Sequence, residues 1–466
     1  MTPPNATIGN VSAATHTAVA TILERCQALS RFSEVPGATR RAFLSAPMRA
    51  CHAEIAKWLA PLGIATRIDA AGNLHAVYPA AVPPASDSAA NSVARPSLDQ
   101  SVPTFLIGSH LDTVPNAGAY DGVLGVVLAV ALLESLAGRR LPFAIELLGL
   151  SEEEGVRFGV PFIGSRALVG RLDEDLLRRT DAHGISVRHA IEDFGLQPSA
   201  IPQAALGPNI LGFLEFHIEQ GPVLEDLGLP LAVVDAIAGQ SRLEFIFSGR
   251  TNHAGTTPMH LRHDALAGAA EWIGAVERSA QSVPGLAATV GVIEAKPGAT
   301  NCIAGQVRVS LDVRHASDAA RRAAASGLIQ IAMQIARARK LQVEHKTLLE
   351  QPATPMHPFL VDRLARSLTA IGCQPHRMAS GAGHDAMILA ERVPSAMLFL
   401  RTPGGVSHDP TETVAPADIA KALACGLHFL LQLSESPDFL HHKYLQSESM
   451  KPDSLIPDSE KRTRRA

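Results

Sequence analysis

The stretch from residue 104 to residue 125 carries three residues that could build a metal site. Residues 104–107 are mostly β-branched and aromatic, which predicts a buried strand, and His110 follows its C-terminal end. Asp121 comes after a Pro/Asn/Gly loop and opens an apolar helix. Ligands gather outside the carboxyl ends of strands in an open α/β sheet, so both side chains are expected in one crevice, where each suits a divalent cation. Asp112 is placed to accept the second ring N–H of His110.

A histidine and an aspartate after a strand more often form a polar pair than a metal site, so this interpretation depends on further ligands. The next predicted strand, residues 142–150, ends in Glu152, Glu153 and Glu154. Consecutive carboxylates usually mark a solvated turn. These follow a core strand beside that of His110, where they can supply a metal ligand and a general base.

Two further histidines follow predicted strands. Residues 211–220 alternate between apolar and polar, with His217 in the middle of the polar face, and His408 lies beyond the strand predicted at 395–400. Three histidines and two carboxylates, one of them bridging, suit two divalent ions about 3.5–4 Å apart. A further carboxylate would deprotonate the bridging water. The chemistry predicted is hydrolysis at a carbonyl without a covalent intermediate.

The elements that position these residues predict an α/β fold with a second domain inserted in it. Residues 239–349 show the β-α-β-β-α-β order of a ferredoxin-like domain. The helices in it are predicted at 263–281 and 318–340, and the second strand at 289–295. Nearer the N-terminus, helical periodicity predicts a helix over 39–62. The other segments of the chain are predicted as a loose N-terminal tail (1–15), a first part of the catalytic domain (16–238) with a low-complexity insertion (79–103), a second part (350–435) and a polar C-terminal tail (436–466).

Composition excludes several classes of function. The net charge of −4 gives no basic footprint for nucleic acid. No apolar run reaches the roughly 18 residues of a membrane span, and the N-terminus lacks the features of a secretory signal. The five cysteines are scattered without CxxC spacing, which argues against a disulfide framework and suits a reducing compartment. A cytoplasmic enzyme is therefore expected, without nucleic-acid or membrane partners.

Seven motifs in order resemble those of the hydantoinase/carbamoylase family of dinuclear-metal amidases. They are GSHLDTVPNAGAYDGVLG, SEEEGVRFG, FHIEQGPVLE, NHAGTTPM, LDVRH, SGAGHDA and GGVSHDPTE. The group includes allantoate amidohydrolases, N-carbamoyl-L-amino acid hydrolases and yeast-type β-ureidopropionases. The resemblance extends from residue 105 to residue 414 and implies a mixed-sheet catalytic domain of zinc-peptidase type with an inserted lid and dimerisation domain.

The resemblance also assigns roles around the metal ions. The residues that match the family's metal ligands are His110, Asp121, Glu154, His217 and His408, with Asp121 bridging. Glu153 matches the general base and Asp112 the residue that orients His110. The additional Glu152 leaves an ambiguity of one residue, and the alignment of the following Gly-Val-Arg-Phe favours Glu153 and Glu154. His217, rather than Glu219, is taken as the ligand from its motif.

Substrate contacts are implied on both parts of the chain. Gln220 resembles a contact to the ureido group, and His384 a further substrate contact. In the inserted domain, Arg314 and Asn301 resemble the contacts to the substrate carboxylate, which an arginine can hold with two parallel hydrogen bonds. His253 resembles the histidine that stabilises the oxyanion, which the partner subunit supplies in this family.

The predicted activity is metal-dependent hydrolysis of the ureido C–N bond of a small carboxylate substrate, allantoate or an N-carbamoyl-L-amino acid, releasing ammonia and carbon dioxide. The resemblance implies a homodimer and two divalent ions per subunit, Zn or Mn, with Co or Ni also compatible. A dipeptidase or aminoacylase of the same superfamily is the alternative enzyme. A non-catalytic binding protein is the alternative from another class, and it would require a missing ligand or base.

Overall fold

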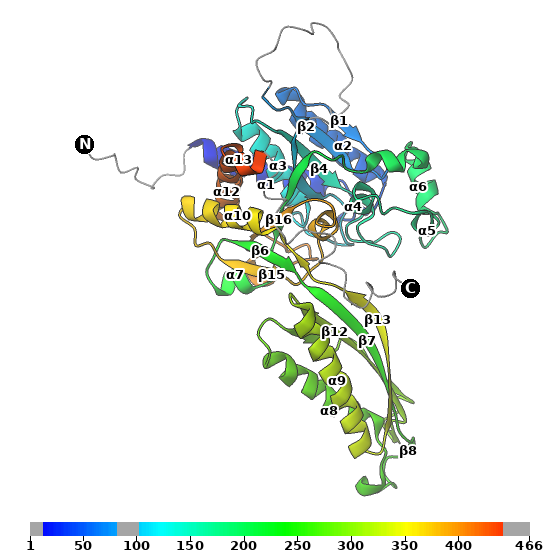
Figure 1. Cartoon of the computed structure of the whole chain (residues 1–466). Helices are drawn as coiled ribbons and strands as arrows, with labels where there is room; N and C mark the ends of the chain where they lie inside the picture. The colour runs from blue at the N-terminus through cyan, green and yellow to red at the C-terminus, as the bar shows by residue number, and fades with distance from the viewer. Residues whose placement is uncertain (1–12, 82–101, 441–466) are drawn as a thin grey trace, which may run out of the picture. The chain divides into compact units, whose positions relative to one another are not determined.

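The computed structural model describes residues 13–81 and 102–440. It divides into two compact units (Figure 1). The first contains residues up to Asp235, residues 356–378 and residues from His384 onward, and the second contains residues 236–355 and 379–383. The predicted N-terminal tail, low-complexity insertion and C-terminal tail lie almost entirely outside the described residues. None of the described helices is long and apolar enough to cross a membrane.

The first unit is built around a mixed sheet with the strand order β1-β2-β4-β3-β5-β16-β6. Its strands are β1 (Thr66–Ile68), β2 (Leu74–Tyr78), β3 (Thr104–His110), β4 (Ala144–Leu150), β5 (Ile210–Ile218), β6 (Leu231–Ile237), β15 (Arg377–Ser380) and β16 (Ser395–Leu400). Its α-helices are α1 (Ala13–Ser30), α2 (Ala46–Leu59), α3 (Val123–Ser135), α4 (Ile163–Leu168), α5 (Glu174–Leu177), α6 (Val187–Asp193), α7 (Val223–Asp226), α10 (Pro358–Ala370), α11 (Asp385–Leu389), α12 (Pro416–Ser434) and α13 (Pro437–Leu440). Short 3-10 turns are Ala60–Leu62, Pro198–Ala204 and Pro403–Gly405. The mixed α/β prediction is confirmed.

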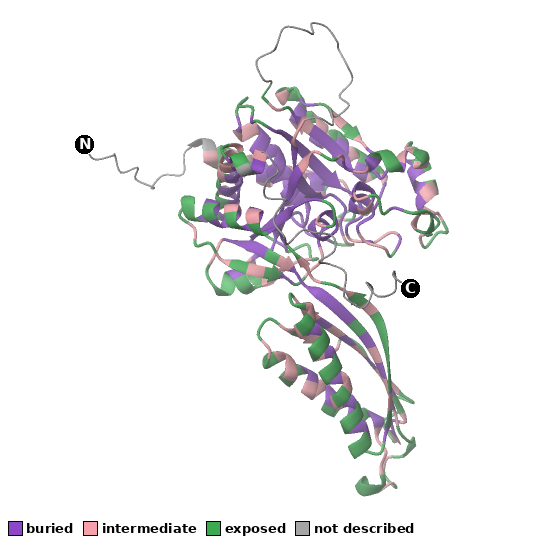
Figure 2. Cartoon of the chain, viewed as in Figure 1, coloured by how far each residue is buried: buried purple, intermediate pink, exposed green. Residues whose placement is uncertain are grey.

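The centre of this sheet is parallel and fully buried. Strands β4, β3, β5 and β16 run parallel in that order, while β2 and β6 join it antiparallel. Every residue of β3, β4 and β16 is buried, as Figure 2 shows for the middle of the unit. Parallel strands are covered on both faces and therefore read as continuous apolar runs. Their carboxyl ends lie along one edge, which collects the polar residues that follow them.

Helix α3 packs directly on two of these strands. A Cβ atom at Gly125 would lie 2.2 Å from the main-chain oxygen of Phe216 on β5 and 2.8 Å from Cβ of Ser109 on β3. Only glycine permits such an approach. The approach brings the N-terminus of α3, and with it Asp121, to the ends of β3 and β5.

The second unit is an antiparallel sheet with two helices. Its strands are β7 (Gly239–Ser248), β8 (Asn252–His253), β9 (Ala287–Thr289), β10 (Ile293–Lys296), β11 (Cys302–Ile303), β12 (Gln306–His315), β13 (Gln342–Gln351) and β14 (Thr354–Pro355). Its helices are α8 (Ala265–Gln281), α9 (Asp318–Ala338) and the 3-10 turn Met259–Leu261. The main sheet has the order β10-β12-β7-β13, with β9 also paired to β12, and Trp272 lies in its apolar core. This order agrees with a ferredoxin-like domain.

Four expectations for the elements are corrected. The helix predicted over 39–62 starts only at Ala46, where the Ser45 hydroxyl accepts from Met48 N and caps it. The strand predicted over 289–295 is broken into β9 and β10. The predicted polar tail from 436 begins with α13, which buries Phe439 against Phe105 and Phe143. The second unit also takes in residues 379–383, outside the predicted inserted domain.

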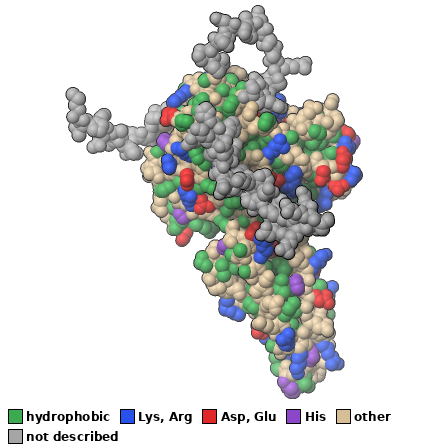
Figure 3. Space-filling view, viewed as in Figure 1, with side chains coloured by type: hydrophobic (Ala, Val, Ile, Leu, Met, Phe, Trp, Pro, Cys, Tyr) green, Lys and Arg blue, Asp and Glu red, His purple; other side chains and the backbone are tan. Residues whose placement is uncertain are grey.

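The surface carries charges of both signs. On the face drawn in Figure 3, Lys and Arg side chains lie among Asp, Glu and uncharged ones. This mixture agrees with the small net charge of −4.

Candidate metal centre

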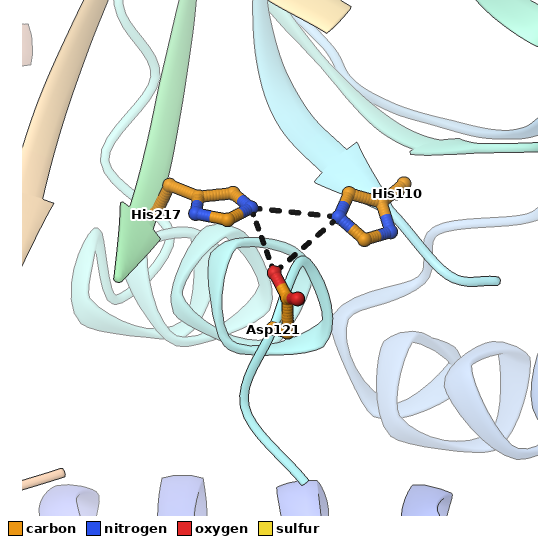
Figure 4. Close-up of side chains that lie close together, drawn as sticks. All are labelled: His110, Asp121 and His217. Atoms are coloured by element: carbon orange, nitrogen blue, oxygen red, sulfur yellow. Dashed lines mark hydrogen bonds and ion pairs between the residues drawn. The ribbon is translucent and has the colours of Figure 1, made fainter. Parts of the chain in front are cut away.

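Three side chains from β3, β5 and the loop before α3 meet at the edge of the first unit's sheet (Figure 4). Asp121 Oδ1 lies 3.2 Å from His217 Nε2 and 3.7 Å from His110 Nε2. The two Nε2 atoms are 3.4 Å apart. All three side chains are buried. The structure therefore brings together three of the predicted ligands.

The protonation of the two histidines makes this arrangement a cation site. Nδ1 of His110 lies 3.0 Å from the main-chain oxygen of Asp112, and Nδ1 of His217 lies 2.8 Å from that of Ile218. A carbonyl oxygen only accepts, so each Nδ1 carries a proton, and each Nε2 presents a lone pair once its ring is neutral. Against the effect of burial, Asp121 raises the pKa of both rings, so a divalent cation would replace the Nε2 protons that the rings otherwise bind. The donor set fits a divalent cation.

A second group of ligands shares Asp121. Its Oδ2 lies 3.1 Å from His408 Nε2, which also lies 3.3 Å from Glu154 Oε1. The possible ligand atoms of Asp121, Glu154 and His408 all lie within 4.8 Å of one another, as do those of His110, Asp121 and His217. Asp121 thus belongs to both groups, with one oxygen toward each, as a bridging carboxylate requires.

The orientation of Asp112 differs from the one predicted. His110 donates its ring N–H to the main-chain oxygen of Asp112, while the Asp112 carboxylate is 3.8 Å from that nitrogen. The carboxylate instead accepts from the main-chain nitrogens of Glu153 and Glu154, each at 3.0 Å. Asp112 therefore holds the segment that carries both glutamates. The sequence could not show this because the carboxylate bonds main-chain nitrogens 41 and 42 residues away.

The three consecutive glutamates separate into different environments. Glu152 Oε1 accepts from Arg157 N at 2.8 Å and Phe158 N at 3.3 Å, and Glu152 is in none of the ligand groups. Glu153 and Glu154 both join a group with His110. Burial raises the pKa of Glu152 to about 8, with a further contribution from Asp112. These contacts favour the assignment of Glu153 and Glu154 over one that includes Glu152.

The pKa values of several side chains around the centre are shifted far from their ordinary values. Burial raises the pKa of Glu153 well above its ordinary value. His110 lowers this pKa, but its effect is smaller than that of burial, and the neighbouring carboxylates raise the pKa further. Burial lowers the pKa of His110, but Asp121 and Glu153 raise it by more, so the pKa lies well above its ordinary value. The pKa of Asp121 is held well below its ordinary value, since His110 and His217 outweigh its burial.

Glu219 and Gln220, which follow the strand that carries His217, have different partners. Both oxygens of Glu219 accept main-chain N–H groups at the start of α7, from Val223 at 2.7 Å and Leu224 at 2.9 Å. Glu219 thus caps a helix. Gln220 points the other way, with Nε2 at 3.1 Å from Asp121 Oδ2 and 3.2 Å from Ser407 Oγ. The predicted face is polar but not exposed, since Glu215 and His217 are both buried.

Two buried glutamates escaped the sequence analysis. Glu412 Oε1 accepts from the main-chain nitrogens of Tyr120 at 2.9 Å and Asp121 at 3.1 Å, so it fixes the backbone of the bridging aspartate. Burial and the Asp121 carboxylate raise its pKa to about 7. Glu215 accepts from Ser109 Oγ at 2.8 Å and from the main chain of α11 at 2.9 Å. In the sequence, Glu412 is marked only by its position four residues after His408. Glu215 is marked only by lying on the same alternating polar face as His217.

His384 also lies beside the centre. Its ring packs edge-on against that of His217, with centroids 4.4 Å apart, and the residue is buried. Burial lowers its pKa well below the ordinary value, and His217 adds to the shift. A neutral ring at this position suits a substrate contact.

The remaining predicted residues, His253, Asn301 and Arg314, belong to the second unit. The His253 side chain is exposed, and its Nδ1 accepts from the main-chain nitrogens of Gly255 at 3.1 Å and Thr256 at 3.2 Å. The main-chain oxygen of Asn301 accepts from Ala254 at 2.9 Å. His253 lies on β8, and Asn301 directly precedes β11, the strand that pairs with β8. The two residues are therefore held close together.

Arg314 is held on one edge by a carboxylate. Its Nε and Nη2 lie 2.9 and 3.0 Å from the two oxygens of Asp312, and Nη1 lies 2.7 Å from the oxygen of Gly381. Arg314, Asp312 and Arg242 border a cavity of about 470 Å³ in the second unit. The arginine predicted to bind a carboxylate is therefore oriented before any substrate arrives.

Residues 106–432 match the model of peptidase family M20/M25/M40. The chain belongs to this family. The match spans both units and includes every predicted site residue. The cluster of possible metal ligands described above thus belongs to an M20 protein.

Several proteins and structures similar to this M20 chain are named as amidohydrolases, deiminases or amidases. The chain is 34% identical to an N-carbamoyl-L-amino acid amidohydrolase of Geobacillus stearothermophilus, over 86% of this chain and 94% of that protein. It is 34% identical to allantoate deiminase 2 of Glycine max, over 88% of each. The crystal structure of a hydantoinase/carbamoylase family amidase from Burkholderia ambifaria superposes with a TM-score of 0.80 at 32% identity, covering 89% of this chain and 97% of that one. The predicted resemblance and the zinc-peptidase type of fold are confirmed.

Proposed function

We propose that this M20 protein hydrolyses the ureido C–N bond of a small carboxylate, allantoate or an N-carbamoyl-L-amino acid, releasing ammonia and carbon dioxide. The observation that carries the proposal is the pair of ligand groups that share Asp121, with Glu153 beside them. The names of the similar proteins support an amide rather than a peptide substrate.

Five residues would hold two divalent ions: His110, Asp121, Glu154, His217 and His408. Divalent ions in such a site polarise a carbonyl oxygen and lower the pKa of water toward about 7. Imidazole and carboxylate ligands accept Zn, Mn, Co or Ni, and we propose Zn or Mn. Asp112 and Glu412 keep the backbone of these ligands in place through the contacts described above.

Glu153 is the proposed general base. Burial raises its pKa, so its carboxylate is a stronger proton acceptor than an exposed glutamate. Glu153 takes a proton from the attacking water and passes it to the leaving nitrogen of the ureido group, which departs as ammonia. The remaining carbamic acid then loses carbon dioxide: its C–N bond breaks, the nitrogen takes the acid proton, and the free amine is left.

Arg314 is proposed to bind the substrate carboxylate. Asp312 occupies the Nε–Nη2 edge of Arg314, so the end of the guanidinium is the part oriented for a substrate carboxylate. The contacts that Nδ1 of His253 accepts place its proton on Nε2, which then donates to a developing oxyanion. Gln220, Asn301 and His384 would contact the rest of the substrate.

We also propose a homodimer in which His253 serves the partner's site, and a location in the cytoplasm. All five cysteines are free, which supports a reducing compartment. A monomer mass in sedimentation equilibrium would contradict the dimer.

The test is ammonia release from a panel of substrates. Protein stripped of metal is given Mn or Zn and then allantoate, several N-carbamoyl-L-amino acids, 3-ureidopropionate and one dipeptide. We expect metal-dependent ammonia from a ureido acid, reduced about 10²–10⁴-fold by Glu153→Gln with the bound metal retained. Glu152→Gln is the matched control, because Glu152 faces main-chain N–H groups outside the ligand groups. Cleavage of the dipeptide alone would overturn the amidase proposal.

A further inference from the structure

Asn73 occupies a buried position behind the segment that carries the glutamates. We call residues 151–154 the carboxylate loop. Asn73 Oδ1 lies 3.1 Å from Ser151 N and 3.4 Å from Ser151 Oγ, and Asn73 is fully buried. Its Nδ2 donates to Gly164 O at 3.1 Å and to Asp69 Oδ2 at 2.8 Å. Both ends of the amide are therefore used, and no other side chain of this size offers both an acceptor and two donors.

A charged network fixes Asn73 from the other side. Asp69 Oδ1 accepts from the main-chain nitrogens of Ala71 and Asn73, each at 2.9 Å. His75 lies between two carboxylates, with Nε2 at 3.1 Å from Asp69 Oδ2 and Nδ1 at 2.7 Å from Glu146 Oε1. Burial lowers the pKa of His75, but these two carboxylates raise it more. Buried polar groups whose hydrogen bonds are all made form a rigid network.

The carboxylate loop depends on contacts from outside itself. Glu152 has a φ of 52°, in the left-handed region that a residue with a side chain rarely adopts. Such a conformation persists only where the surroundings determine it. Asp112 holds Glu153 and Glu154 from one side, and Asn73 holds Ser151 from the other. Gly164 closes the arrangement, since its nitrogen donates to Ser151 O at 2.9 Å.

We propose that Asn73, anchored by Asp69 and His75, is a positioning residue that sets the carboxylate loop so that Glu153 and Glu154 reach the metal centre. Asn73 touches neither substrate nor metal and acts through the main chain and hydroxyl of Ser151. The inference rests on the proposed roles of these two glutamates.

Two variants remove the contact from opposite sides. Asn73→Ala deletes the acceptor for Ser151 N. Gly164→Ala adds a Cβ atom that would lie 2.1 Å from Asn73 Oδ1 and 2.7 Å from Ser151 N, so the amide or the loop must shift. Groups that orient metal ligands typically change affinity or activity by about 10–100-fold. We expect each variant to lower kcat at saturating Mn(II), and to weaken Mn(II) binding measured by chelator competition, by about tenfold or more, with KM changed by less than about twofold.

Tyr78→Phe is the matched control. Tyr78 lies at the end of β2, the strand that Asn73 directly precedes; it is buried and donates one hydrogen bond, to Arg139 O at 3.0 Å, away from the loop. It should lower the melting temperature without changing kcat, KM or Mn(II) affinity. The proposal is overturned if Asn73→Ala and Gly164→Ala match Tyr78→Phe in both kcat and Mn(II) affinity. If the unaltered protein releases no ammonia from any ureido acid, the proposed function fails, and the Mn(II) affinities alone decide this inference.

Discussion

At the scale of single residues, main-chain carbonyls decide what the centre can bind. The main-chain oxygens of Asp112 and Ile218 accept hydrogen bonds from Nδ1 of His110 and His217. Each Nε2 is therefore the ring nitrogen that could bind a metal ion, and no additional side chain is needed to fix the tautomer. The same rule separates His217 from Glu219, because both Glu219 oxygens already accept N–H groups at the start of α7.

This difference gives a prediction at position 217 and position 219. His217→Ala should lose one of two bound cations, since it removes a donor that lies 3.2 Å from Asp121 Oδ1. Glu219→Gln should retain both and lower stability by about 1 kcal/mol, the usual cost of weakening a helix cap. Metal content after dialysis and urea unfolding measure the two effects. Loss of a cation in Glu219→Gln with full retention in His217→Ala would reverse the assignment.

At the scale of elements, buried strands were the part of the fold that local sequence could predict. The strand at 395–400 was predicted with its observed bounds because Pro394 precedes it and six apolar or small residues follow. The break between β9 and β10 was missed, because Val292 N donates to Ser310 Oγ, a partner 18 residues away. Asn73 and Glu412 were missed for the same reason. Their importance comes from contacts 78 and 292 residues distant, which no local pattern encodes.

Helix α2 introduces a pH-sensitive group into the core. His52 is buried edge-on against Phe194, and neither ring nitrogen has a hydrogen-bond partner among the described residues. Burial, with Arg41 adding to the effect, lowers its pKa from 6.5 to about 4. Between these values the unfolded chain binds more protons than the folded one. Stability contributed by neutral His52 is therefore complete above pH 6.5 and is lost as the pH falls toward 4.

His52→Leu should flatten this dependence. From pH 7 to pH 5 the free energy of unfolding of the unaltered protein should fall by about 2 kcal/mol more than that of the variant, since the variant has no ring to protonate. Urea titrations followed through Trp58, on the same helix, measure both. Parallel pH profiles would show that His52 is already charged in the folded protein, or does not control acid stability.

At the scale of the whole molecule, each unit has its own core and its own tryptophan. Trp58 lies on α2 of the first unit, beneath the guanidinium of Arg25. Trp272 is buried in the second unit, where its ring N–H donates to Leu328 O at 2.9 Å. The sequence contains only these two tryptophans, so Trp272→Phe and Trp58→Phe each leave a fluorescent reporter in one unit.

Metal binding should stabilise the units unequally. All the proposed metal ligands belong to the first unit, and a ligand stabilises only the folded region that binds it. At a free Mn(II) concentration of 100 times its Kd, one bound ion should add about 2.7 kcal/mol to the unfolding free energy reported by Trp58 in Trp272→Phe. The transition reported by Trp272 in Trp58→Phe should not move. Equal shifts at both reporters would instead show that the two units unfold as one cooperative body, in which case occupancy of the metal centre governs the stability of the whole chain.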